Sequence, residues 1–236
     1  MAVDQALVVV LRRFGVTPDA RAALRTLLEL LALPAAPTSI HEPAKGVDVH
    51  IADSLTGLDI DDVRNARVIA DIGSGAGLPG LVLAAALPDA HVFLVEAAAR
   101  KCEFIRSAAV AMRLANVDVV WSRVETWSEG MERCDVVCAR ALARLAVLCE
   151  YAAPLLREGG LLVAWKGAVA DDEAADGAAA AAHLGLEADP PRSVVPFSGS
   201  ARRTLHILRK VAPTPRNYPR RPGTAAKRPL TARNLR

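Results

Sequence analysis

Two kinds of hydrophobic spacing divide the chain. In the first sixty residues the apolar positions recur at helical spacing. Thr17-Pro18-Asp19 is a helix start, because a hydroxyl residue, a proline and an acid suit the N-cap, the first helical position and the first turn. A further helix is predicted over residues 47–58, where His50 and Asp53 share one face. These segments predict a helical N-terminal extension over residues 1–60.

From residue 67 onward, short apolar runs alternate with segments of helical spacing. This alternation is typical of βαβ units, in which a parallel sheet is covered by helices on both faces. We expect the last two runs to pair as antiparallel strands, so the sequence predicts an α/β fold with a mostly parallel sheet. The predicted strands are 67–71, 91–96, 117–121, 135–139, 160–165, 193–197 and 204–210, and the helices among them are 78–87, 98–114, 142–156 and 171–184.

The charges are distributed unevenly along the chain. It has 236 residues, of which 52% are hydrophobic and 23% charged, a balance typical of a globular protein. The net charge of +3 hides a basic end, because residues 201–236 contain eleven Lys and Arg without any acid, whereas 18 basic and 26 acidic residues precede them. This asymmetry predicts contact with a polyanion, and the alternative is a solubilising tail. Prolines without periodicity predict a basic extended tail over residues 212–236, after a central domain over residues 61–211.

Several classes of protein are disfavoured by composition. The four cysteines are too few for a disulfide scaffold, and Cys134 and Cys138 lack the histidines or second cysteine pair that would complete a zinc site, so we expect no metal. No stretch approaches the roughly 18 apolar residues of a transmembrane helix, and the first apolar run is too short for a signal peptide. We therefore expect a cytoplasmic protein that does not bind a membrane.

A glycine-rich loop, D-I-G-S-G-A-G-L-P-G at residues 71–80, follows the first predicted strand. Glycines let the backbone turn tightly and approach a ligand at the carboxyl end of a strand. Residues 75–80 match the dinucleotide fingerprint G-x-G-x-x-G, a weak signal when it stands alone. In a dinucleotide site this loop would have to hold the negatively charged pyrophosphate. Asp71 places a carboxylate beside the loop, where it would repel that group. We therefore predict S-adenosylmethionine, which carries an ammonium and a sulfonium and no phosphate, rather than NAD.

Two further acids follow the next strands. Glu96 ends the second predicted strand, 21 residues after Gly75, where a carboxylate can accept both hydroxyls of a ribose. That position suits either cofactor. After the third predicted strand, Val124 can pack on an adenine ring, and Glu125 can accept a hydrogen bond from its exocyclic amine. A solvated loop acid is the alternative for Glu125.

Short motifs follow one another in a defined order along most of the chain, and together they resemble those of a known family. The glycine loop alone indicates only a class I methyltransferase, whereas the other motifs in this order are specific. The chain resembles the RsmG (GidB) family, the methyltransferases that modify a guanine at N7 in the decoding-region loop of bacterial 16S rRNA. The motifs are H-x-x-D-S-L at 50–55, the glycine loop at 71–80, R-V-E at 123–125, A-R-A at 139–141, K-G at 166–167, Y-P-R-R-P-G at 218–223 and K-R-P-L at 227–230.

The resemblance implies a class I S-adenosylmethionine-dependent methyltransferase with a Rossmann-like sheet, acting on 16S rRNA or the 30S subunit. Thr38-Ser39-Ile40 departs from the family's Asn-Leu-Thr, and Glu96 replaces its usual Asp. The alternative is a class I methyltransferase acting on another RNA, a small molecule or a protein. The expected cofactor residues, from the residues and the resemblance together, are Asp71, Gly73, Gly75, Gly77, Leu78, Glu96, Val124, Glu125 and Arg140.

Guanine N7 is a nucleophile without losing a proton, so the reaction requires positioning rather than a general base. We expect His50, Asp53 and Arg140 to position the base, with a helix cap or a salt bridge as the structural alternative. We also expect a monomer, whose tail folds over substrate or cofactor when these bind. Phosphate contacts and base stacking need cations and aromatic rings. The candidates are Arg123, Arg144, Lys166, Arg216, Tyr218, Arg220, Arg221, Lys227 and Arg228.

Overall fold

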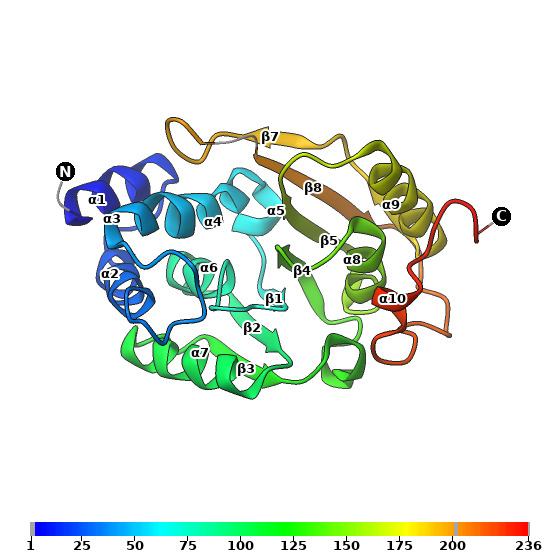
Figure 1. The fold of residues 1–236 in the computed structure, drawn as a ribbon, viewed down its shortest axis with the longest axis horizontal. Coiled ribbons are helices and arrows are strands. Elements are labelled where there is room, and N and C mark those ends of the chain that lie inside the picture. The colour runs from blue at the N-terminus through cyan, green and yellow to red at the C-terminus, as the bar shows by residue number, and fades with distance from the viewer. Residues whose placement is uncertain (1–2, 201–202, 236) are drawn as a thin grey trace.

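The computed structural model describes residues 3–200 and 203–235, and it shows one sheet with helices against both faces (Figure 1). In this part of the chain the sheet has eight strands in the order β3-β2-β1-β4-β5-β8-β6, and β7 also pairs with β8. Strands β1 to β5 are parallel, and β8 is antiparallel to its neighbours. The strands are β1 Val68–Ile72, β2 His91–Glu96, β3 Val117–Trp121, β4 Cys134–Arg140, β5 Leu156–Lys166, β6 Leu186–Ala188, β7 Arg192–Val194 and β8 Arg203–Lys210.

The predicted α/β fold is confirmed, and every predicted strand has a counterpart within a few residues. Strand β6 was not predicted, because three residues are too short to show a period. Nor was helix α1, which precedes the predicted helix start at Thr17-Pro18-Asp19. Among the described residues no helix is long and apolar enough to cross a membrane. The α-helices are α1 Val3–Arg13, α2 Ala20–Leu31, α3 Pro43–Gly46, α4 Asp53–Leu55, α5 Asp61–Arg64, α6 Gly80–Ala86, α7 Ala99–Ala111, α8 Leu145–Ala152, α9 Asp171–His183 and α10 Thr224–Lys227.

The helix predicted over 47–58 is a succession of three helical forms. A π-helix, η1 Val47–Ala52, runs into α4, and a 3₁₀-helix, η2 Thr56–Asp59, follows. A π-turn widens the helix by one residue per turn and is common at functional sites. His50 lies in the π-helical turn and Asp53 is the first residue of α4. The segment is therefore helical as predicted, but its pitch changes at the residues that were expected to position the base.

Alternating side chains of the central strands enter two separate cores. In β4, Val136 and Cys138 pack with helices α1, α2 and α4 to α7, whereas Val137 packs with α8 and α9 on the other face. This is the period-two alternation of a strand buried on both faces. The N-terminal helices thus share a core with the sheet, and they cover the edge at which the parallel strands end.

The C-terminal tail is folded against the domain, so the prediction of an extended tail over 212–236 is wrong. Helix α10 lies beside α8, and Ala225 and Leu230 are buried in the same core as that helix. Arg220 donates two hydrogen bonds to the Glu150 carboxylate of α8, at 2.8 and 2.5 Å, and Glu150 is 1% exposed. A buried carboxylate requires such a partner. The tail docks because it supplies both that cation and an apolar contact.

Replacing Arg220 with alanine should lower the free energy of unfolding by about 3 kcal/mol, because the Glu150 carboxylate would stay buried without its cation. Arg221→Ala is the matched control, since Arg221 is the next residue and is exposed. The control should change stability by less than about 0.5 kcal/mol. Urea denaturation of both variants measures the difference, and equal effects would contradict a tail anchored by this ion pair.

Candidate active site

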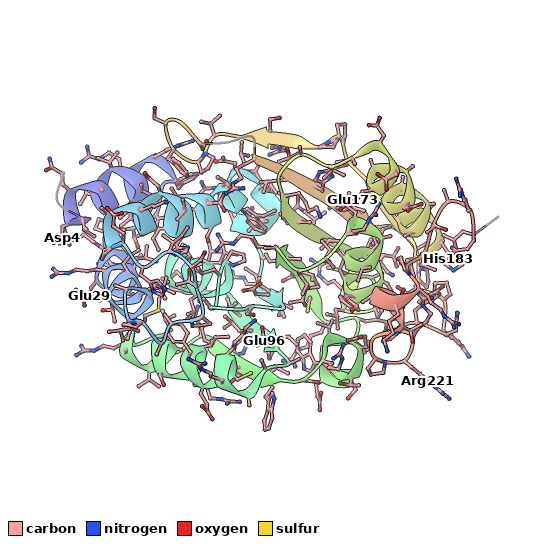
Figure 2. All side chains as sticks on the ribbon, viewed as in Figure 1. Asp4, Glu29, Glu96, Glu173, His183 and Arg221 are labelled. Atoms are coloured by element: carbon pink, nitrogen blue, oxygen red, sulfur yellow. The ribbon has the colours of Figure 1, made fainter. Side chains whose placement is uncertain are left out.

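A cavity of about 390 Å³ opens at the carboxyl ends of the parallel strands. Its volume lies in the range of small-molecule sites, and this edge is where open α/β sheets bind ligands. Loops from β1, β2, β3 and β4 form its walls, and Glu96, labelled in Figure 2, closes one side. Thr38 and His50 come from the N-terminal region. The N-terminal extension therefore contributes to the site and is not a separate appendage.

The glycine loop adopts backbone angles that favour glycine. Gly73, Gly75 and Gly77 have φ of 64°, 61° and 82°. A Cβ at Gly73 would lie 2.5 Å from Leu142, and one at Gly77 would lie 2.5 Å from Leu81, whereas a Cβ at Gly75 would meet nothing closer than 3.9 Å. Packing therefore requires glycine at positions 73 and 77. Gly75 leaves open space beside the cavity, where a ligand can approach the backbone.

Asp71 and Gly77 lie behind the cavity wall rather than on it. Asp71 is 1% exposed, its Oδ2 accepts a hydrogen bond from the Gly80 N–H at 2.9 Å, and its carbonyl accepts one from the Ser74 hydroxyl. Burial raises the pKa of the Asp71 carboxyl to about 7. The expectation that these two residues contact the cofactor is therefore corrected, because the strand's alternation turns Asp71 toward α6. Their role is to hold the loop.

Glu96 stands where the sequence places it. It is 7% exposed, its Oε2 accepts a hydrogen bond from the Gly75 N–H at 3.0 Å, and its Oε1 accepts one from the Ala98 N–H at 2.9 Å. Lys101 Nζ lies 4.0 Å from the carboxylate and also lines the cavity. A carboxylate has about four acceptor positions, so Glu96 retains capacity for ribose hydroxyls. Sequence reasoning missed Lys101, because it is one polar position of an ordinary helix.

Glu125 is reached by the C-terminal tail. Val124 and Glu125 both line the cavity, as expected, and Glu125 is 9% exposed. Glu125 Oε1 accepts a hydrogen bond from the Gly223 N–H at 2.7 Å, and Arg123 Nε lies 3.8 Å from Oε2. Tyr151 of α8 completes this wall, although its position in an apolar helix gave no signal in the sequence. The tail thus fixes an acid of the site.

His50, Asp53 and Arg140 are brought to one wall, as the sequence indicated. Arg140 donates to Asp53 Oδ2 at 3.1 Å, and Arg203 Nε lies 3.3 Å from Asp53 Oδ1. His50 Nε2 is 3.2 Å from the Ile40 carbonyl, and burial lowers the pKa of its ring. Asp53 thus lies between two arginines. Arg203 was missed, because it sits in an apolar strand far along the chain.

The residues predicted to bind RNA are Tyr218 and a set of cations that fall into two groups. Tyr218 contacts α9, because its ring packs edge-on against His183 and its hydroxyl lies 3.1 Å from His183 Nε2. RNA contact remains a prediction for all of these residues. The cations paired with an acid are Arg144 with Asp172 at 2.5 Å, Lys166 with Glu173 at 2.7 Å, Arg220 with Glu150, and Arg123 with Glu125 at 3.8 Å. The other group, all exposed, consists of Arg216, Lys227, Arg228 and Arg221, which points away from the body in Figure 2.

Comparison with known proteins gives a consistent set of relatives. Residues 24–203 match the family model GidB, described as rRNA small subunit methyltransferase G. Proteins named ribosomal RNA small subunit methyltransferase G are similar over most of the chain. They include those of Rubrobacter xylanophilus, 43% identical over 80% of this chain and 75% of the relative, and of Bacillus subtilis, 35% identical over 82% of each.

Solved structures share the fold. The 16S rRNA (adenine(1408)-N(1))-methyltransferase from Catenulisporales acidiphilia has a TM-score of 0.52 and 18% identity, covering 65% of this chain and 92% of its own. The precorrin-6y C5,15-methyltransferase from Geobacter metallireducens has a TM-score of 0.51 and 17% identity, covering 67% and 88%. At this identity the likeness concerns the fold alone, and both neighbours are named methyltransferases.

Burial of Asp71 should make stability depend on pH. The pKa of Asp71 is about 7 in the folded protein and near its ordinary value of 3.8 when unfolded. The folded state therefore keeps a proton that the unfolded state releases. The free energy of unfolding should fall by roughly 1.4 kcal/mol per pH unit between about pH 4 and 7 from this group. Urea denaturation across this range should show a shallower slope in Asp71→Asn and the wild-type slope in Asp89→Asn, an exposed control. A wild-type slope in Asp71→Asn would contradict the assignment.

Proposed function

The chain belongs to the GidB family, rRNA small subunit methyltransferase G, and is a methyltransferase of ribosomal RNA; we propose that it transfers the methyl group of S-adenosylmethionine to N7 of a guanine in the decoding-region loop of 16S rRNA. The observation that carries the proposal is the cavity at the strand ends, which is lined by Glu96, Glu125 and the open backbone at Gly75. Two acids in the lining of such a cavity suit hydroxyls and amines, and they disfavour a dinucleotide's phosphates.

The residues present fit S-adenosylmethionine. Glu96 would hold the ribose hydroxyls through its remaining acceptor positions, and Val124 and Glu125 would hold the adenine. The methionine end would lie along Gly73 and Leu78. The fit is supported by the empty space where a Gly75 side chain would be, since that space admits a ligand against the backbone.

The chain's own residues have to position the reactants rather than move protons. When bound, the cofactor supplies an electrophilic methyl on a sulfonium, and the lone pair of guanine N7 can form the new N–C bond as the C–S pair returns to sulfur. Burial lowers the pKa of the His50 ring, which disfavours its charged form beside N7. Arg140, fixed by Asp53, is held on the wall shared by cofactor and base. Positioning of this kind is a large part of enzymatic rate enhancement.

The substrate-facing surface combines the N-terminal extension with the folded tail. We propose residues 1–60 and 61–211 as extension and methyltransferase domain, with residues 212–236 docked on the latter. The exposed cations of the tail supply phosphate contacts that would hold rRNA or the 30S subunit. We expect a monomer acting in the cytoplasm. A class I methyltransferase with another substrate would share every cofactor residue, and the exposed basic tail favours RNA over that alternative.

Methyl transfer tests the function directly. Purified protein and S-adenosylmethionine should convert one guanine of 16S rRNA, or of 30S subunits from a strain lacking the modification, to N7-methylguanine. Chemical cleavage at N7-methylguanine locates the nucleotide, and mass spectrometry identifies the product. A methylated base other than guanine, or a methyl on another atom, would contradict the proposal.

Glu96→Gln should weaken binding of S-adenosylhomocysteine by about tenfold to a hundredfold, because hydrogen bonds to a charged acceptor contribute roughly 1.5–3 kcal/mol. Isothermal titration calorimetry measures the affinity. Glu103→Gln on α7, which changes an exposed acid in the same region, should leave it unchanged. Unchanged affinity in Glu96→Gln, with a wild-type melting temperature, would remove Glu96 from the cofactor site.

A further inference from the structure

A second cavity of about 430 Å³ opens beside the first. The two share Thr38, His50, Arg140 and Ala141, so one wall separates them. We propose that this second cavity holds the target guanine, flipped out of the RNA, and that Asp53 accepts hydrogen bonds from the Watson–Crick edge of the base. The inference rests on the proposed function and adds to it the residue that would distinguish guanine from adenine.

Residues that line this cavity carry most of the unsatisfied buried polar atoms in the described part of the chain. Five buried side-chain nitrogen or oxygen atoms lack a hydrogen-bond partner there, and three belong to residues that line this cavity: His50 Nδ1, Asp53 Oδ1 and Arg203 Nε. Arg203 Nε lies 3.3 Å from Asp53 Oδ1, but the two atoms are not aligned for a hydrogen bond. Buried polar groups are normally satisfied, and three orphans at one cavity indicate a polar ligand that completes them.

The chemistry of these atoms matches guanine. The Watson–Crick edge of guanine presents two donors side by side, N1–H and the N2 amine, and a carboxylate accepts from both. Adenine offers an acceptor at N1, which would face the Asp53 carboxylate and be repelled. O6 of guanine, next to N1, accepts from a cation, and Arg140 and Arg203 flank Asp53. With this edge on Asp53, N7 lies on the neighbouring Hoogsteen edge of the base, beside O6, and is free for the methyl group.

The walls of the cavity suit a flat ring. Ile40, Val49, Ala168 and Trp165 supply apolar surface. Trp165 is 4% exposed, and its Nε1 donates to the Asp53 carbonyl at 2.9 Å and to the Thr56 hydroxyl at 3.0 Å. The indole is therefore fixed, and it fixes the backbone of Asp53 in turn. Enzymes that act on a base bind it in such a pocket, between apolar side chains and hydrogen bonds to its Watson–Crick edge.

Asp53 is placed to stabilise the transition state of methyl transfer as well as to bind the base. Attack by N7 leaves positive charge on the imidazole part of the purine, and this charge makes N1–H and the N2 amine stronger hydrogen-bond donors. A carboxylate bonded to that edge attracts the charged product-like ring more strongly than the neutral one. Electrostatic groups fixed in advance where charge develops stabilise the transition state. Ion pairs with Arg140 and Arg203 hold the Asp53 carboxylate in place before the base arrives.

The substrate side of the contact can be tested without altering the protein. Once the methylated guanine is located, a synthetic RNA segment carrying guanosine or inosine at that position is ligated into 16S rRNA and assembled into 30S subunits. Inosine keeps N7 and lacks only the N2 amine. Wild-type protein should show kcat/KM at least about tenfold lower on inosine, the loss expected for one hydrogen bond to a charged acceptor. Equal rates on the two substrates would overturn the inference.

Asp53→Asn tests the protein side. It should lower kcat/KM on guanosine by about tenfold or more and bring the guanosine-to-inosine ratio near one. Asp48→Asn on the same helical segment, which does not line the cavity, is the matched control and should keep the wild-type ratio. A wild-type ratio in Asp53→Asn would overturn the inference, since a purely structural role lowers both rates equally. Absence of N7-methylguanine with wild-type protein would instead overturn the proposed function itself.

Discussion

The ion pair between Asp53 and Arg140 joins the two parts of the molecule on which the site depends. Asp53 comes from the N-terminal helices, and Arg140 comes from the end of β4 in the sheet. Asp53 is buried and Arg140 is half-buried, so each needs the other to limit an uncompensated charge. The pair therefore fixes how the N-terminal helices lie over the strand ends. Because Arg140 lines both cavities, the same contact sets the wall between cofactor and base.

The C-terminal tail makes a second set of long-range contacts on which the site depends. Its Arg220 neutralises Glu150 inside the core of α8, and three residues later the Gly223 N–H bonds to Glu125 at the cofactor cavity. A segment that the sequence predicts to be an extended basic tail is thus part of the domain's packing. If Glu125 binds the cofactor and the exposed cations bind phosphate, as proposed, the tail links cofactor affinity, stability and RNA contact.

Sequence pattern was sufficient for the sheet and for the acids at its edge. The apolar runs gave the strands, and the topology of parallel strands then brought Glu96, Glu125 and Arg140 to one edge. The pattern could not predict which way a side chain points or which distant segments of the chain come into contact. Asp71 is an acid beside the glycine loop, yet the strand's alternation turns it away from the cavity. Arg203 joins the site only because β8 returns next to β5, a pairing that no local period reveals.

The tail was misjudged for a related physical reason. Proline and basic residues predict an extended segment when they are read in isolation, because they indicate neither a helical nor a strand period. Folding here is decided by a partner outside the segment, the Glu150 carboxylate, which stands in an otherwise apolar helix. An acid at such a position was itself the available signal, since burying it without a cation would be costly. The basic tail, whose cations had no assigned acidic partner, was the available source of that cation.

In the proposed reaction the charges of the two cavities have different roles. The cavity proposed for the cofactor is lined by Glu96 and Glu125, acids that suit hydroxyls, amines and a cationic ligand. The cavity proposed for the base has Asp53 between Arg140 and Arg203, so that the acid would face donors on a neutral ring while its surroundings remain positive toward phosphate. Methyl transfer moves positive charge from the first side to the second. An acid already present on the receiving side lets that charge arrive beside a carboxylate, without a proton being moved and without a general base.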